Sequence, residues 1–172
     1  FDLLNDHSDL SFFLFLPDFD LHATYAPPAS FASKFWSDSN AGLYAGEMAF
    51  ADHCIGQFIT KLKQLELYDS TLIIVTSDHG EMLGSHGEET HAYFIYQSAI
   101  KVPLIFKLPG KNKPAKIEKI AGTIDIVPTI CNLLKIHAPE HIQGKDLSPF
   151  FHGNRPVNND RYLYSESQYP TR

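Results

Sequence analysis

The stretch LIIVTSDHGE, residues 72–81, says more about the fold of this 172-residue chain than any other segment. Its first half, Leu72 to Val75, is apolar and largely β-branched, which predicts a buried strand. A carboxylate, Asp78, and an imidazole, His79, follow where this strand should end. Open α/β sheets usually bind their ligands at the carboxyl ends of their strands. We therefore interpret Asp78 and His79 as candidate metal ligands on an α/β sheet.

A long helix is predicted immediately before this strand. From the capping residues Ser39 or Asn40, apolar residues recur at steps of three and four as far as Leu65. The helix should end near Leu67-Tyr68, after which the chain turns into the strand. A helix that leads into a buried strand favours parallel order, so we expect an α/β fold with a mostly parallel sheet flanked by helices.

Further elements are expected on both sides. The apolar run Ser11–Leu16, stopped by Pro17, suits a strand buried on both faces. Val102–Phe106 reads as another strand, and Arg161–Glu166 as a short last one. A short helix should begin near Asp125 and end near Ile136. The Asp125 carboxylate is explained by helix capping and by the helix dipole without a bound ion.

Composition limits the classes of protein and partner. An apolar content of 44% can fill the core of one domain. The net charge is −6, and no basic cluster suited to nucleic acid occurs, since the lysines of residues 111–119 read as a solvated loop. No apolar run approaches the roughly 18 residues of a membrane span. The two cysteines, Cys54 and Cys131, are expected to be buried free thiols.

Several motifs together resemble the sulfatase family of the alkaline phosphatase superfamily. They are Ser77–Gly87 with its DHGE and HG elements, Thr90-His91, and the VPLI segment at residues 102–105. The similarity extends from the FLFL segment at residues 13–16 through the GKDL segment at residues 144–147 to the SES segment at residues 165–167. The resemblance implies an alkaline phosphatase-like fold and metal-dependent hydrolysis of a sulfate ester.

The resemblance also implies roles for individual residues. His22, which precedes the YAPP element at residues 25–28, matches a histidine that contacts the sulfate group of the substrate. Asp78 and His79 match metal ligands, and His91 falls where many members place a lysine. Either His22 or His91 is expected to protonate the leaving group. His86 is left between a site role and shaping of the glycine-rich turn, whereas Glu81, Glu88 and Glu89 are expected to be solvated.

Other parts of the family's active site are expected outside this chain. The family's nucleophile, a formylglycine made within a Cys/Ser-x-Pro-x-Arg motif, has no counterpart here, nor has the paired-aspartate motif. Residues 1–172 are therefore expected to be a partial catalytic domain, truncated on its N-terminal side and inactive alone. The resemblance implies Ca²⁺ as the metal, with Mn²⁺ or Zn²⁺ as alternatives. A sulfated small molecule or glycan is the expected substrate, and the family is mostly periplasmic, secreted or lysosomal.

Two further functions remain open. One is a phosphodiester or phosphonate monoester hydrolase, or a phosphoethanolamine transferase, of the same superfamily. A formylglycine nucleophile would favour sulfate or phosphonate esters, and an unmodified threonine would favour phosphoethanolamine transfer. The second is a non-catalytic sulfatase-like domain that binds a sulfated glycan or a protein partner.

Overall fold

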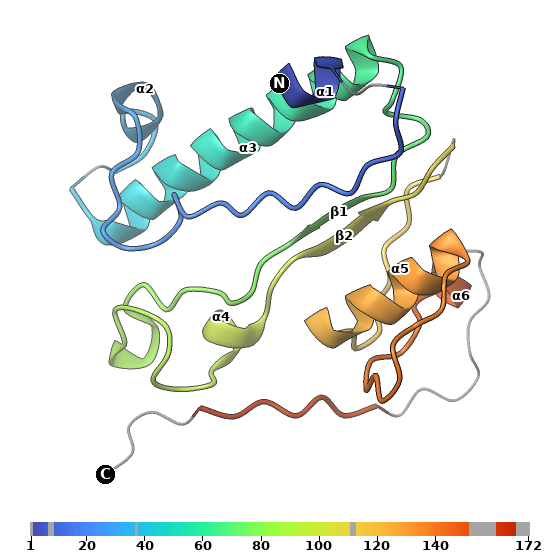
Figure 1. Ribbon diagram of the computed structural model, residues 1–172. Helices are drawn as coiled ribbons and strands as arrows, with labels where there is room; N and C mark the ends of the chain where they lie inside the picture. The colour runs from blue at the N-terminus through green and yellow to red at the C-terminus, as the bar shows by residue number, and fades with distance from the viewer. Residues whose placement is uncertain (1, 7–8, 37, 111–112, 152–160, 168–172) are drawn as a thin grey trace. The chain divides into compact units, whose positions relative to one another are not determined.

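The computed structural model describes residues 2–6, 9–36, 38–110, 113–151 and 161–167. The chain divides into two compact units. The first comprises Phe1–Ile73, Met82–Thr90 and Lys107–Lys111, and the second comprises Ile74–Glu81, His91–Phe106 and Asn112–Arg172. The elements are labelled along the chain in Figure 1. None of the helices in the described ranges has the length and apolar character needed to cross a bilayer.

The first unit is built on the long helix α3, Asn40–Gln64, as the sequence predicted. The Ser39 side chain caps its first turn by accepting a hydrogen bond from the Gly42 N–H at 3.1 Å. The C-cap is Leu65, slightly earlier than expected. Two short helices belong to the same unit, α1 (Asp2–Asp6) and α2 (Ala29–Ala32), and α2 packs on α3.

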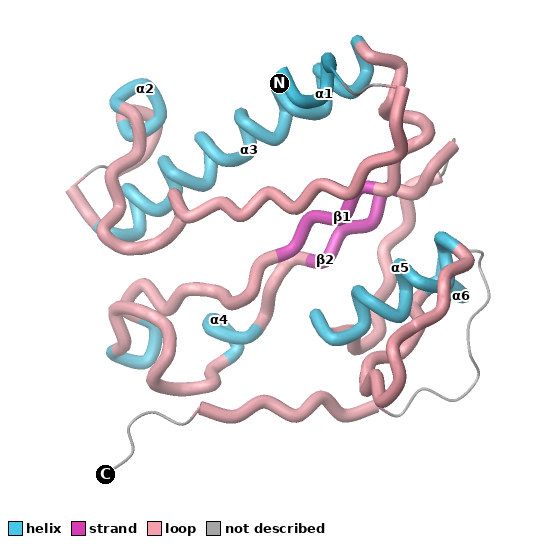
Figure 2. Tube along the Cα trace, viewed as in Figure 1, coloured by secondary structure: helices cyan, strands magenta, loops and turns pink. Residues whose placement is uncertain are grey.

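The predicted strands at residues 72–76 and 102–106 are present as β1, Ile73–Thr76, and β2, Leu104–Lys107. They form a two-stranded sheet (Figure 2). Thr76 Oγ1 bonds the Pro103 carbonyl, and Gly80 N bonds the Ala99 carbonyl, so the paired residue numbers rise on one side and fall on the other. The pair is therefore antiparallel, whereas the sequence predicted parallel order.

The connection between these strands explains that difference. A parallel pair needs a crossover, usually a full helix, that carries the chain back to the start of the next strand. The segment between β1 and β2 holds only the single turn η1 (Ser85–Gly87) and the four-residue helix α4 (Gln97–Ile100). The chain therefore enters β2 at the end of the sheet where β1 finished, and β2 runs in the opposite direction.

The predicted strand at residues 11–16 is not formed among the described residues. The segment has no regular structure, and the side chains of Phe13 and Phe15 are 83% and 77% exposed. A strand requires a hydrogen-bonded neighbour, and no other described segment pairs with it. The short strand expected at residues 161–166 is likewise irregular.

The second unit is centred on α5, Ile126–Leu134, which follows the turn η2, Thr123–Asp125. The helix α6, Ser148–Phe151, packs against α5. Thr129 Oγ1 donates to the Asp125 carbonyl at 2.6 Å and accepts the Leu147 N–H at 2.9 Å. These bonds tie the helix to the segment before α6.

Asp125 is a buried structural carboxylate. It is fully buried and pairs with Arg161 through two bonds of 2.5 and 2.6 Å. It also accepts the N–H groups of Gly122 and Lys145. Its side chain thus bonds the backbone of the turn before α5 and makes no capping bond to α5 itself. These bonds account for the buried carboxylate without a bound metal.

The two cysteines differ in their surroundings. Both are free thiols, but Cys54 is exposed on α3 and only Cys131 on α5 is buried. The expectation that both are buried was therefore wrong for Cys54. Residues 52–57 make more than one full turn of α3 and are all exposed, so this part of the helix is open on every face, including the one that carries Cys54.

Candidate functional site

The site begins where β1 ends. Ser77 Oγ donates to the His79 carbonyl at 2.6 Å, and the His79 N–H donates to Asp78 Oδ1 at 2.9 Å, which together form a tight turn. The Gly80 N–H donates to the Ala99 carbonyl at 2.7 Å. A Cβ on Gly80 would lie 2.1 Å from the Ser98 carbonyl oxygen, so the close approach requires glycine.

The Asp78 and His79 side chains present their donor atoms close together. His79 Nδ1 lies 2.8 Å from the Gly80 carbonyl, and because a carbonyl only accepts, this nitrogen carries the proton. The second ring nitrogen, Nε2, lies 3.7 Å from Asp78 Oδ1. Burial opposes the ionisation of Asp78, but the neighbouring His79 and the hydrogen bonds to its carboxylate outweigh that and lower its pKa.

This pair fits one part of a metal site. Histidine ligands usually donate their second N–H to a carbonyl or carboxylate, as His79 does to Gly80. The Asp78 side chain is 86% exposed, so a ligand can reach its carboxylate. Within the described ranges no cluster of three or more His, Cys, Asp or Glu residues is arranged to hold a metal. A metal site built on Asp78 and His79 would therefore need further ligands.

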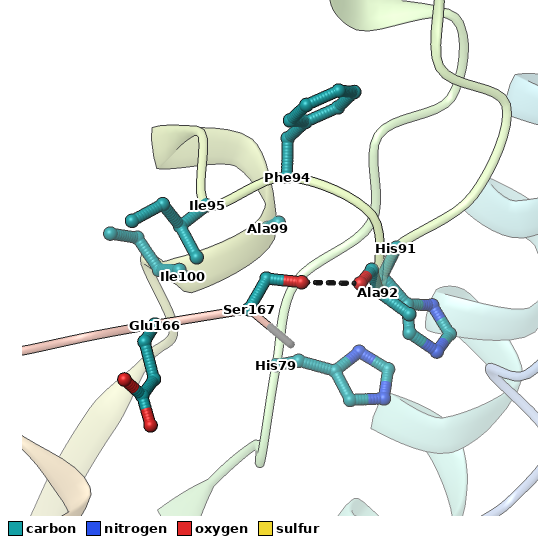
Figure 3. Close-up of a pocket in the computed structure, with 9 residues that line it drawn as sticks. All are labelled: His79, His91, Ala92, Phe94, Ile95, Ala99, Ile100, Glu166 and Ser167. Atoms are coloured by element: carbon teal, nitrogen blue, oxygen red, sulfur yellow. Dashed lines mark hydrogen bonds between the residues drawn. The ribbon is translucent and has the colours of Figure 1, made fainter. Parts of the chain in front are cut away.

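His91 lies against His79 in the same unit. The two imidazole rings are stacked, with centroids 3.7 Å apart and planes inclined by 25° (Figure 3). His91 Nδ1 lies 3.2 Å from Glu81 Oε2, and the Glu81 side chain is only 3% exposed. The expectation that Glu81 is solvated was thus wrong, since its carboxylate turns inward to His91.

Glu81 ends the DHGE element, but no local pattern of apolar and polar residues predicts that it is buried while Glu88 and Glu89 are not. All three are acidic residues in a polar, glycine-rich segment, and only the return of the chain at His91 gives Glu81 a partner. Glu89 is exposed, as expected, and Glu88 is partly exposed. Residues 82–90 contain no strand and no α-helix, so no regular repeat brings Glu81 and His91 together.

A pocket of about 390 Å³ opens beside the two imidazoles. Figure 3 shows Phe94, Ile95 and Ile100 along it, with Glu166 and Ser167 contributed by the segment at residues 161–167. Ser167 Oγ donates to the Ala92 carbonyl at 2.9 Å and fastens this segment beside His91. Ala92 has a φ of 89°, a strained value for a residue with a Cβ.

His22, the remaining predicted site residue, belongs to the first unit, whereas Asp78, His79 and His91 belong to the second. His22 is exposed, and its Nδ1 lies 2.9 Å from the Ala23 carbonyl. The loop that follows it is held on α3: the Ala26 N–H donates to Glu47 Oε1 at 2.6 Å. Tyr25 also packs edge-on against Tyr44, with ring centroids 5.4 Å apart.

His86 lies in the first unit, in the turn η1. It is exposed, with a left-handed φ of 56°, and its Nδ1 lies 2.9 Å from Ser85 Oγ. This geometry fits one of the two roles left open for His86, that of shaping the turn.

Comparison with known proteins places these features in context. The profile of the Sulfatase family matches residues 1–136. The chain is 36% identical over 128 residues to the multifunctional alkaline phosphatase superfamily protein PehA of Trinickia caryophylli, covering 73% of this chain and 25% of that protein. It is 28% identical over 178 residues to the steryl-sulfatase of Rattus norvegicus, covering 95% and 30%.

A solved structure is similar as well. The phosphonate monoester hydrolase SpPMH from Silicibacter pomeroyi matches with a TM-score of 0.64 and 37% identity, over 74% of this chain and 25% of that one. The chain spans less than a third of the length of each of these three proteins.

Proposed function

We propose, from the premise that the chain belongs to the sulfatase family, that it is part of the catalytic domain of a sulfuric ester hydrolase. The observation that carries the proposal is the placement of Asp78, His79 and His91 in one small site beside a pocket. Residues 1–172 would supply these groups, and the rest of an alkaline phosphatase-like α/β domain with a mostly parallel sheet would supply the nucleophile.

Asp78 and His79 would hold a divalent cation together with ligands from outside this chain. When bound, such a cation acts as a Lewis acid that polarises the sulfate oxygens and lowers the pKa of the nucleophile's hydroxyl. Asp78 contributes a carboxylate whose pKa is lowered, and in the neutral ring of His79 the Gly80 carbonyl places the proton on Nδ1, which leaves Nε2 as the nitrogen that can bind a metal. We propose Ca²⁺ because the carboxylate is a hard oxygen ligand, with Mn²⁺ or Zn²⁺ as alternatives that suit the imidazole better.

His91 is the proposed general acid of this unit. Its Nδ1 is hydrogen-bonded to Glu81, so in the doubly protonated ring the Nε2–H group would give its proton to the departing oxygen while the Nδ1 bond stays in place. His22 is proposed to bind the sulfate group once the complete domain is assembled. Hydrogen-bond donors at these positions would stabilise the negative charge that develops on the leaving group.

The proposed substrate is a sulfated small molecule or glycan. The similarity to a steryl-sulfatase suggests a small molecule, and the net charge of −6 disfavours a nucleic acid partner. A periplasmic, secreted or lysosomal location is proposed by analogy with the family alone.

Phosphonate or phosphate ester hydrolysis is the second candidate. The similarity to the phosphonate monoester hydrolase, at 37% identity, favours it over phosphoethanolamine transfer and over a non-catalytic binding domain. The groups described here serve both hydrolytic reactions, because each transfers a tetrahedral, anionic centre to an oxygen nucleophile.

The test uses the full-length protein that contains this segment. We expect it to release sulfate from an aryl sulfate, and we expect Asp78→Asn and His91→Ala to lower kcat by about 100-fold or more. Glu89→Gln, a change at an exposed residue of the same segment, should leave the rate unchanged. Chelation followed by addition of Ca²⁺, Mn²⁺ or Zn²⁺ identifies the metal. Faster turnover of a phosphonate monoester would favour the second candidate, and no turnover of either ester would favour a binding domain.

A further inference from the structure

The buried carboxylate of Glu81 is a group of the site for which the proposed reaction has no use. Glu81 follows Gly80, whose N–H is bonded to Ala99, so the backbone before it is held in place. Its side chain is 3% exposed and reaches His91 Nδ1 at 3.2 Å. Burying a carboxylate costs free energy unless it accepts hydrogen bonds. The bond from His91 offsets part of that cost, and the question is what the buried pair does for the site.

The contact determines which ring nitrogen of His91 carries a proton. An ionised carboxylate only accepts hydrogen bonds, and therefore Nδ1 of His91 is the donor. In the neutral imidazole the second nitrogen, Nε2, is then the unprotonated one, and it is the atom that takes up and gives back the proton of acid catalysis. Without such a partner the ring could exchange between its two tautomers and rotate about its Cβ–Cγ bond.

A second contact restrains the same ring from its face. The His79 imidazole stacks on His91 with centroids 3.7 Å apart. The Glu81 bond lies at the edge of the ring and the His79 contact lies on its face, so together they define both its tilt and its rotation. His79 is in turn oriented by the Gly80 carbonyl.

From these contacts we infer that Glu81 is a positioning residue, which keeps the proton of His91 on Nδ1 and directs Nε2 toward the group being transferred. The inferred use of Nε2 rests on the proposed function, whereas the tautomer of His91 does not. Glu81 itself touches neither substrate nor metal in this role. A carboxylate that orients a catalytic imidazole through its second nitrogen is a general arrangement in enzymes.

A purely structural role makes different predictions. If Glu81 only fastened the chain at residue 91, its loss would lower the stability of the fold. It would not change the tautomer of His91, and it would not lower kcat selectively over KM. Spectroscopy of the ring and a double-mutant cycle therefore separate the two roles.

The first measurement is nitrogen-15 NMR of histidine-labelled full-length protein, with the His91 signals assigned by their loss in His91→Gln. We expect a proton on Nδ1 of His91 in the wild type. We expect Glu81→Met, which keeps the volume but has no acceptor, to convert His91 to a mixture of tautomers. Glu89→Met, at an exposed glutamate, should leave the His91 spectrum unchanged. A wild-type His91 protonated only on Nε2 would overturn the inference without any variant.

The second measurement is the rate of sulfate ester hydrolysis. Glu81→Met should lower kcat by about 10- to 100-fold with little change in KM, and Glu81→Gln, which keeps an acceptor oxygen, should recover part of that loss. In a His91→Ala background, Glu81→Met should cost nothing further. An equal loss in both backgrounds would contradict the inference while leaving the proposed function intact. Conversely, a tautomer change in a protein that hydrolyses no sulfate ester would reject the proposed function alone.

Discussion

At the scale of the residue, Asp125 and Arg161 form the most completely buried charged contact among the described residues. Their side chains are 0% and 6% exposed and lie 36 residues apart in the sequence. The carboxylate receives four N–H bonds, two of them from the guanidinium, which satisfies the acceptor capacity of both oxygens. The pair therefore joins the turn before α5 to the segment that begins at Arg161.

Removing one member of this pair should be costly. Asp125→Ala leaves the buried Arg161 charge uncompensated, so we expect the stability of α5 to fall by about 3–5 kcal/mol. Hydrogen exchange of the α5 amides measures this loss locally. Glu118→Gln is the matched control, because the Lys116–Glu118 pair is 85% and 77% exposed and should contribute less than about 1 kcal/mol. Equal effects of the two changes would contradict the assignment.

Two buried carboxylates should give the stability opposite dependences on pH. Burial raises the pKa of Asp125, but the bonds from Arg161, Gly122 and Lys145 outweigh it, and the folded pKa lies below the ordinary 3.8. Its contribution is complete above that value and is lost as the pH falls toward the folded pKa. For Glu47, burial raises the folded pKa above 4.5, so its ionised form destabilises the fold, and protonation on acidification relieves that penalty.

Unfolding measured by urea between pH 7 and pH 3 tests both signs. As the pH is lowered from the raised pKa of Glu47 to about 4.5, the wild-type protein should gain stability, and we expect Glu47→Gln to lack this gain. We expect Asp125→Asn to remove the loss that begins below about pH 3.8. Glu47→Gln keeps an oxygen that can accept the Ala26 N–H, so it isolates the charge. An unchanged pH profile in either variant would show that the carboxylate concerned does not control it.

At the scale of the element, glycine has opposite roles in the turn after β1 and in α3. Gly80 lies so close to the Ser98 carbonyl that a Cβ would be 2.1 Å from it, whereas Gly56 is exposed within α3 with no atom within 4 Å of such a Cβ. The same substitution should therefore have opposite effects at the two positions.

We expect Gly80→Ala to destabilise by about 1–3 kcal/mol and to displace His79, because the turn must open to accept the methyl group. Gly56→Ala should stabilise by about 0.5–1 kcal/mol, since alanine is the better helix former and meets no neighbour. Thermal unfolding of the two variants checks both values. A neutral Gly80→Ala would mean that β1 and the segment before α4 are not held as closely as the 2.7 Å Gly80–Ala99 bond indicates.

At the scale of the whole molecule, the irregular segment at residues 10–19 exposes much apolar surface. Its most exposed side chains include Phe13 at 83%, Phe15 at 77% and Phe19 at 77%. Proteins rarely leave contiguous apolar surface of this kind facing water, and an unpaired extended segment is a template for association.

The chain expressed alone should therefore aggregate. We expect light scattering at micromolar concentration, and we expect the double change Phe13→Ser with Phe15→Ser to reduce it strongly. Ile136→Ser, at an apolar residue that is 56% exposed elsewhere in the chain, is the control and should have little effect. Equal scattering by the wild type and the double variant would show that another surface drives association.

The elements that the sequence predicted correctly are those whose signals are local. Ser39 and the three- and four-residue apolar repeat define α3, and the β-branched run defines β1, within windows of a few turns or residues. The same local pattern placed Asp78 and His79 side by side at the end of β1. Family motifs also indicated His91 and His22, whose roles stay predictions.

The sequence by itself thus determined the family, the helix α3, the strands β1 and β2, and the adjacency of Asp78 and His79. Only the tertiary structure decided that β1 and β2 are antiparallel, that Glu81 is buried against His91, and that Asp125 binds Arg161. The physical reason is that propensities and caps act over a few residues. Burial and ion pairing depend instead on where the chain returns, and no local pattern encodes contacts across 10 or 36 residues.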